Sequence, residues 1–163
     1  MNLTLRPATD ADRDFLLAVY ASTRADEMAM VPWDDAAKRA FVTQQFTAQD
    51  AFYREHYDHA SFDVVLRDDV PVGRLYVSRG PEEIRVMDIA LLPEYRGAGI
   101  GAHLLGEICA EADATGRFVG IHVEHHNVAQ RLYARLGFVP TADRGVYLYL
   151  VRPAATPQPN TAS

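Results

Sequence analysis

The stretch that decides the fold is RVMDIALLPEYRGAGIGAHLLGEICAEA, residues 85–112. Its first part, residues 86–92, is an apolar run interrupted by Asp88, which has the length and composition of a buried strand, and Pro93 ends it. A glycine-rich turn follows at residues 96–101. After the turn, apolar side chains from Leu104 to Ala112 recur at the spacing of an amphipathic helix. The predicted order is therefore strand, glycine turn, helix.

This order has a chemical meaning. The first N–H groups of a helix lack partners within the helix and lie at the positive end of its dipole, and glycines let an anion approach the backbone closely. The turn is therefore a candidate cradle for a phosphate or pyrophosphate. The alternative is that the glycines simply permit a tight connection between strand and helix.

Length and composition predict one soluble domain. The chain has 163 residues, of which 48% are hydrophobic and 23% charged, and we expect a domain over residues 1–152 followed by a flexible tail over residues 153–163. The formal charge of −6 gives no general attraction for nucleic acid. No apolar run is long enough to span a membrane and no secretory signal is visible. The single cysteine, Cys109, fits a cytoplasmic protein without disulfides.

The rest of the chain alternates between strand and helix patterns. Thr9 predicts the start of a helix over residues 10–27, and Pro32 with Asp34 that of a second helix to about His56. Two strands at 62–67 and 72–78 form a hairpin, and a strand at 118–123 should run parallel to 86–92, because a helix separates them. The pattern also predicts a first strand at 3–5, a helix at 127–136 capped by Asn127, and closing strands at 138–140 and 146–151.

A second motif lies in HHNVAQRLYARLGFVP, residues 125–140. Together with IALLPEYR and RGAGIG, the run from Asn127 to Phe138 resembles the GNAT superfamily of N-acetyltransferases. The resemblance implies an α/β (α+β) fold in one domain, with a mixed, twisted, mostly antiparallel sheet of about seven strands and about four helices. It also implies that the parallel strands of Ile89 and Ile121 splay apart in the middle of the sheet to admit acetyl-CoA.

The resemblance further implies an enzyme that transfers an acetyl group from acetyl-CoA directly to a primary amine of a small molecule or peptide. Tyr133 would be the general acid near the departing sulfur. Family members often have a glutamate in the central strand where this chain has Met87, so Asp88, Glu124, His122 or a water chain remain candidates for the general base. Residues implied in cofactor binding are Ile89, Ala90, Leu91, Arg96, Gly97, Ala98, Gly99, Ile100, Gly101 and Asn127.

Two further groups of side chains have simpler alternatives. Trp33, Tyr53 and Tyr57 could line the acceptor site or simply pack against the sheet and the first helix. His122, His125 and His126 lie near Glu124, but adjacent histidines of an extended chain point in opposite directions, so we expect no metal.

Two other functions fit parts of the sequence. Gly97, Gly99 and Ala102 match the dinucleotide fingerprint, but the chain after them is too short for the βα units which that fold needs. A non-catalytic acyl-CoA sensor or interaction module would keep the fold without the reaction. Homodimers are frequent in the family that the chain resembles, so a second copy is a candidate partner.

Overall fold

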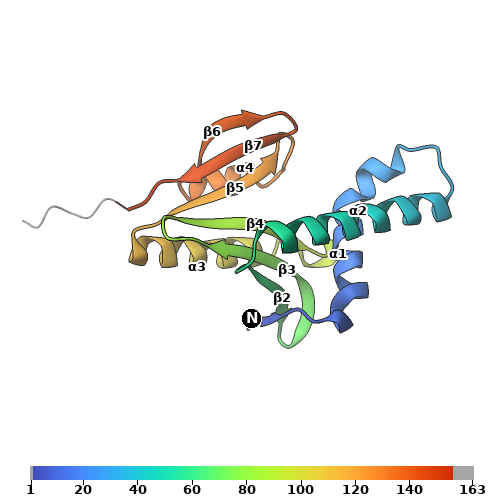
Figure 1. The fold of residues 1–163 in the computed structure, drawn as a ribbon, viewed down its shortest axis with the longest axis horizontal. Coiled ribbons are helices and arrows are strands. Elements are labelled where there is room, and N and C mark those ends of the chain that lie inside the picture. Colours follow the sequence, from blue (N-terminus) through green and yellow to red (C-terminus); the bar gives the residue numbers. More distant parts are fainter. Residues whose placement is uncertain (1, 156–163) are drawn as a thin grey trace, which may run out of the picture. The chain divides into compact units, whose positions relative to one another are not determined.

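The computed structural model describes residues 2–155, which form seven strands and four α-helices (Figure 1). The strands are β1 (Leu3–Pro7), β2 (Ser61–Arg67), β3 (Val70–Arg79), β4 (Glu83–Leu91), β5 (Phe118–Glu124), β6 (Val139–Arg144) and β7 (Tyr147–Arg152). The helices are α1 (Arg13–Ala29), α2 (Asp35–His56), α3 (Ile100–Thr115) and α4 (Gln130–Arg135). Neighbouring strands follow the order β1-β2-β3-β4-β5-β7-β6. The predicted tail lies mostly outside the described residues.

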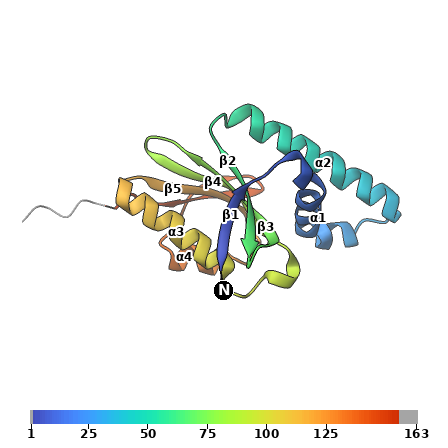
Figure 2. The ribbon, with the colours of Figure 1, turned by 90° about the horizontal axis from the view of Figure 1, so that it is seen from below.

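The chain divides into two compact units, and the first contains residues 2–76 and 88–100. Strand β1 pairs antiparallel with β2, and α1 lies beside α2 in both ribbon views (Figures 1 and 2). Apolar side chains from both helices and β2 form its core: Leu16, Tyr20, Val42, Phe46 and Val64. Burial of these side chains, more than helix propensity, holds α1 and α2 against the strands.

The second unit contains residues 77–87 and 101–155. Here β4 pairs in parallel with β5, and β7 pairs antiparallel with both β5 and β6. The Arg152 side chain of β7 bonds Asp113 of α3 and the carbonyl of Leu136, just after α4. Because side chains alternate along a strand, Tyr149 lies on the opposite face, and its register partner His122 shares that face. The sheet of this unit therefore has one face toward α3 and α4 and another that carries Tyr149 and His122.

Local signals explain most element boundaries. The Asp34 carboxylate accepts a hydrogen bond from the N–H of Ala37 at 2.7 Å and caps α2, as predicted. The β2–β3 turn places Asp68 and Asp69 at positive φ (49° and 68°), which suits a tight hairpin. The first helix starts later than predicted, because residues 10–12 form a 3₁₀ turn before α1.

The prediction for the fourth helix was wrong at its start. Asn127 does not begin the helix, because its side-chain oxygen accepts a hydrogen bond from the N–H of Ala129 in a turn that precedes α4. Val128, in the same turn, is 98% exposed. The penultimate strand is longer than predicted and extends from Val139 to Arg144.

Candidate functional site

The glycine turn has the open backbone that its sequence predicts. Gly97 and Gly99 have φ of +78° and +84°, a left-handed conformation that side chains with a Cβ rarely adopt. No atom lies within 4 Å of a Cβ built at either position. Within residues 2–155, nothing accepts a hydrogen bond from the N–H groups of Gly97, Ala98 or Gly99. The turn therefore presents free donors at the beginning of α3, which suits an anion.

Arg96 fixes this turn and is not itself a free donor. Its N–H group donates to the carbonyl of Pro93 at 3.2 Å, so this N–H already has an acceptor. Its guanidinium donates to the carbonyl of Leu91 at 3.0 Å and to the hydroxyl of Ser22 at 3.3 Å. The side chain thus ties the turn to the end of β4 and to α1.

The end of β4 before the turn, Ile89 to Leu91, lies close to β3. A Cβ at Gly73 would lie 2.8 Å from the Leu91 side chain, so only glycine permits this approach, and the N–H of Leu92 donates to the carbonyl of Val72. The parallel register with β5 ends at Val86 and Ile121. Strand β4 therefore continues beyond the segment paired with β5.

Asp88 is committed to a buried arginine. The Arg74 side chain is 2% exposed and donates to both carboxylate oxygens of Asp88, at 3.0 and 2.8 Å, and to the side-chain oxygen of Gln49 at 3.0 Å. The hydroxyl of Tyr53 lies 3.4 Å from the same carboxylate. An unpaired charge in an apolar strand would be costly, and this bidentate pair gives Asp88 a partner. A carboxylate held in this way is poorly suited to accept a proton from a substrate.

Tyr133 lies in the short helix α4 and is 4% exposed. Its ring packs edge to face on Phe138, with centroids 5.7 Å apart. The N–H of Phe138 donates to the carbonyl of Tyr133, so a backbone hydrogen bond joins two residues of the N-x-A-x-x-L-Y-x-x-L-G-F motif. Asn127 holds the turn that leads into this helix through its bond to Ala129.

The end of β5 contains Glu124 and the histidines. His125 contacts the carbonyl of Gly145 at 2.9 Å and Asp143 at 3.3 Å, so it fastens the β6–β7 turn. His122 accepts a hydrogen bond from Arg144 at 2.9 Å and packs on the Tyr149 ring. Burial, together with the charges of Arg85 and Arg144, lowers the pKa of His122 below its ordinary value of 6.5. Among the described residues, no group of three or more potential ligands could hold a metal ion.

The three aromatic residues proposed to line the acceptor site do not form one wall. Trp33 precedes α2 and packs on Phe41, whereas Tyr53 and Tyr57 contact each other at the opposite end of this 22-residue helix. At 1.5 Å per residue these ends are about 30 Å apart. Trp33 therefore does not share a site with Tyr53 and Tyr57.

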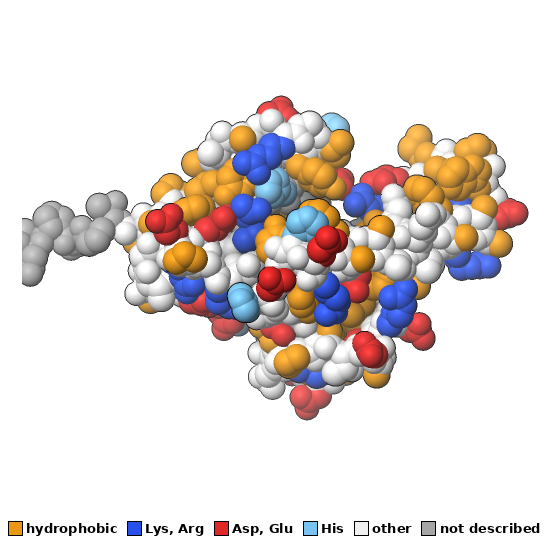
Figure 3. Space-filling model, in the orientation of Figure 1, with side chains coloured by type: hydrophobic (Ala, Val, Ile, Leu, Met, Phe, Trp, Pro, Cys, Tyr) orange, Lys and Arg blue, Asp and Glu red, His pale blue; other side chains and the backbone are white. Residues whose placement is uncertain are grey.

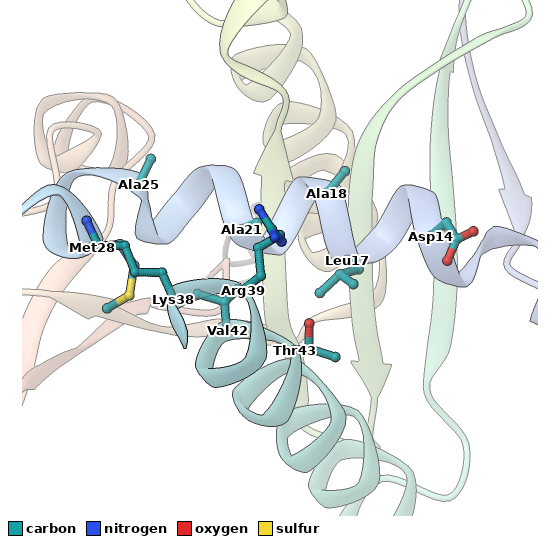
Figure 4. A pocket seen from close by; sticks show the side chains of 10 residues that line it. All are labelled: Asp14, Leu17, Ala18, Ala21, Ala25, Met28, Lys38, Arg39, Val42 and Thr43. Atoms are coloured by element: carbon teal, nitrogen blue, oxygen red, sulfur yellow. The ribbon is translucent and has the colours of Figure 1, made fainter. Parts of the chain in front are cut away.

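A separate apolar pocket of about 490 Å³ lies between α1 and α2 (Figure 4). Small and apolar side chains such as Ala18, Ala21 and Val42 line it, with Lys38 and Arg39 on α2. None of the residues predicted for the active site is among those lining it, so this pocket does not mark the predicted cofactor site.

Several charged contacts were missed by the sequence analysis. Arg74 lies in the run VPVGRLYVS, and an arginine opposite Asp88 on a neighbouring apolar strand is a signal that could have been used. The contacts among Glu83, Arg85, His122, Arg144 and Tyr149 depend on strand register, which single residues do not reveal.

Comparisons with known proteins agree on one family. Residues 23–138 match the model of the acetyltransferase (GNAT) family. A provisionally named ribosomal protein bS18-alanine N-acetyltransferase of Bacillus subtilis is 31% identical over 104 residues, covering 61% of this chain and 68% of that protein. The PaiA N-acetyltransferase of Thermoplasma acidophilum, solved with coenzyme A, matches with a TM-score of 0.69 and 15% identity over 94% of this chain and 99% of its own. An acetyltransferase from Thermus thermophilus matches with a TM-score of 0.69 and 21% identity, covering 94% of this chain and 97% of its own.

Proposed function

Because the chain belongs to the acetyltransferase (GNAT) family, we propose that it transfers the acetyl group of acetyl-CoA directly to a primary amine through the residues named below. The observation that carries the proposal is the glycine turn at residues 97–99, with free N–H donors at the start of a helix. A diphosphate is the part of acetyl-CoA that such donors recognise.

The glycine turn and the end of β4 supply most of the proposed cofactor-binding residues. Gly97, Ala98 and Gly99, with Ile100 and Gly101 at the first turn of α3, hold the pyrophosphate of acetyl-CoA. The backbone of Ile89, Ala90 and Leu91 pairs with the amides of the pantetheine arm, because β4 continues past the segment that pairs with β5. Asn127 contacts the cofactor from the turn before α4.

The reaction needs a base for the amine and an acid for the sulfur. The base removes one proton from the ammonium, the amine nitrogen attacks the thioester carbon, and the carbon–sulfur bond breaks as Tyr133 protonates the sulfur. The nitrogen then loses its second proton, which returns through water to the Tyr133 oxygen. Asp88 is occupied by Arg74, and the unprotonated nitrogen of His122 is occupied by Arg144. We assign the base role to Glu124, acting directly or through one water, because it lies at the carboxyl end of β5, where open α/β sheets commonly place ligands.

The acceptor is an amine that reaches the Tyr53 and Tyr57 end of α2. The relative from Bacillus subtilis is named for the alanine of a ribosomal protein, so the amino terminus of a protein joins small amines as a candidate class.

A cytoplasmic location suits the single free cysteine, Cys109. A homodimer is the expected assembly, which light scattering measures directly.

The test begins with binding. Acetyl-CoA should raise the Tm while NAD should not, and stabilisation by NAD alone would contradict the proposal. A panel of amines and peptides is then screened for release of free CoA, and binding without release from any of them would indicate a sensor.

Tyr133 is tested once an acceptor is known. Tyr133→Phe should lower kcat by about 10²-fold or more, because general acid catalysis contributes about 10²–10⁴-fold. Phe138→Leu, which alters the neighbouring ring without removing a hydroxyl, is the matched control. Turnover by Tyr133→Phe at the rate of the wild type would remove Tyr133 from the acid role.

A further inference from the structure

A cluster of basic side chains surrounds Tyr149 on the face of the second unit that lies away from α3 and α4. The guanidinium carbon of Arg144 lies 4.4 Å from the centroid of the Tyr149 ring, and that of Arg85 lies 5.1 Å from it. The His122 ring packs on the same tyrosine with centroids 4.8 Å apart. Figure 3 shows basic side chains and a histidine gathered on this part of the surface. Two arginines and a histidine therefore contact the same aromatic ring.

Glu83, the carboxylate of this cluster, already has hydrogen-bond donors. It accepts hydrogen bonds from Arg85 at 2.7 and 3.1 Å and from the Tyr149 hydroxyl at 2.9 Å. Gly120 leaves room for this arrangement, because a Cβ there would lie 2.7 Å from the Tyr149 oxygen. Glu83 thus balances Arg85 and leaves the charge of Arg144 uncompensated.

Arg144 has no acidic partner among the described residues. One of its nitrogens, Nη1, donates to Nε2 of His122 at 2.9 Å. Because Nε2 accepts this bond, the proton of the neutral imidazole is on Nδ1. The other N–H donors of the guanidinium have no bonded partner in the described chain, and the side chain is exposed.

We propose that Arg144 and His122 form a binding site for an oxyanion, a carboxylate or a phosphate group. Arg144 supplies the planar fork of donors that fits either group. When protonated, His122 supplies a further donor, Nε2–H, whereas Arg85 is neutralised by Glu83. In a chain of net charge −6, this local excess of positive charge is a specific feature and does not reflect a generally basic surface. The site does not depend on the proposed acetyl transfer.

The test uses the titration of His122 as a direct readout. The groups that face His122 are Arg85 and Glu83 on β4, Arg144 on β6 and Tyr149 on β7. Protonation of Nε2 breaks the bond from Arg144, and a bound anion can accept from both side chains, so its presence should raise the pKa of His122 by about one pH unit. NMR titrations of the histidine ring signals are recorded in phosphate, in acetate and in chloride at equal ionic strength. His122→Asn assigns the signal among the six histidines.

Variants separate this site from general screening by salt. Arg144→Gln should abolish the response to the anion, whereas Arg144→Lys should keep part of it, since the charge stays but the fork is lost. Arg39→Gln, which removes an exposed arginine of α2, should respond as the wild type does.

The outcomes are distinct. A response to phosphate alone identifies a phosphoryl ligand, and a response to acetate alone identifies a carboxylate. Equal titration curves in phosphate, acetate and chloride overturn the proposal, as does a full response in Arg144→Gln. Stabilisation by acetyl-CoA is measured on the same samples, so loss of this site and failure of the proposed function are seen separately.

Discussion

Replacing Asp88 with asparagine removes the charge that compensates Arg74 while keeping the size of the side chain. Arg74 is 2% exposed and would keep its charge, since a guanidinium does not lose its proton in a protein. Its remaining acceptors would be Gln49 and one amide oxygen, neither of which carries a charge. The folded state should therefore be destabilised by an uncompensated buried cation.

The magnitude follows from the burial of the pair. Removing one partner of a buried ion pair costs about 3–5 kcal/mol. Because the Asp88 side chain is 15% exposed and water partly replaces it, we take the lower end, about 3 kcal/mol. For a chain of this length, about 1 kcal/mol changes the Tm by about 2–4 °C, so the Tm should fall by about 6–12 °C.

Urea unfolding followed by fluorescence and calorimetry measures this effect. The double variant Arg74→Met with Asp88→Leu removes both charges and should recover most of the loss, because apolar replacements of a buried pair are tolerated. A loss below about 1 kcal/mol in Asp88→Asn would refute the structural role. Unchanged stability with a large fall in kcat would instead return Asp88 to the role of general base.

Two further predictions concern the glycine turn and the amino-terminal region. Gly99→Ala should raise the Kd for acetyl-CoA by about tenfold or more, about 1.4 kcal/mol, because a methyl group enters the proposed pyrophosphate site. Gly145→Ala is the control, because Gly145 has a similar φ of +79°, and calorimetry should show an unchanged Kd. If both variants weaken binding equally, strain alone explains the effect. Arg6 lowers the pKa of Asp12 to about 2, so this carboxylate contributes stability above about pH 4 that is lost as the pH falls toward 2. Urea unfolding between these pH values should show that Asp12→Asn removes about 1 kcal/mol of the pH dependence of the free energy of unfolding. The value is small because the Arg6 side chain is 40% exposed. The same pH dependence in the variant and the wild type would contradict this assignment.

Local patterns predicted the backbone of the central motif well. The open glycine turn between β4 and α3 follows from positions that only glycine occupies easily, and these signals are contained in a few neighbouring residues. The start of α4 was missed because an asparagine can cap a helix or close a turn with the same oxygen. In this chain Asn127 closes the turn and Val128 is exposed.

Contacts set by distant residues could not be read in the same way. The bond of Arg144 to His122 joins β6 to β5, and it depends on how both strands align with β7. By contrast, the separation of Trp33 from Tyr53 follows from the predicted length of the second helix, which the structure has as Asp35–His56, so it could have been read from the sequence. Strand register is a tertiary fact that single residues do not reveal.

Each of the two units is built from two separate segments of the chain, which affects folding during synthesis and the result of proteolysis. Residues 77–87 belong with the later part of the chain, while residues 88–100 return to the earlier part. A nascent chain that ends at Tyr76 therefore lacks a piece of the first unit, and it acquires that piece only after eleven residues that belong elsewhere have been synthesised. Neither unit can be expressed as a continuous fragment, and a protease cut at Gly80 would leave each of them assembled from both products.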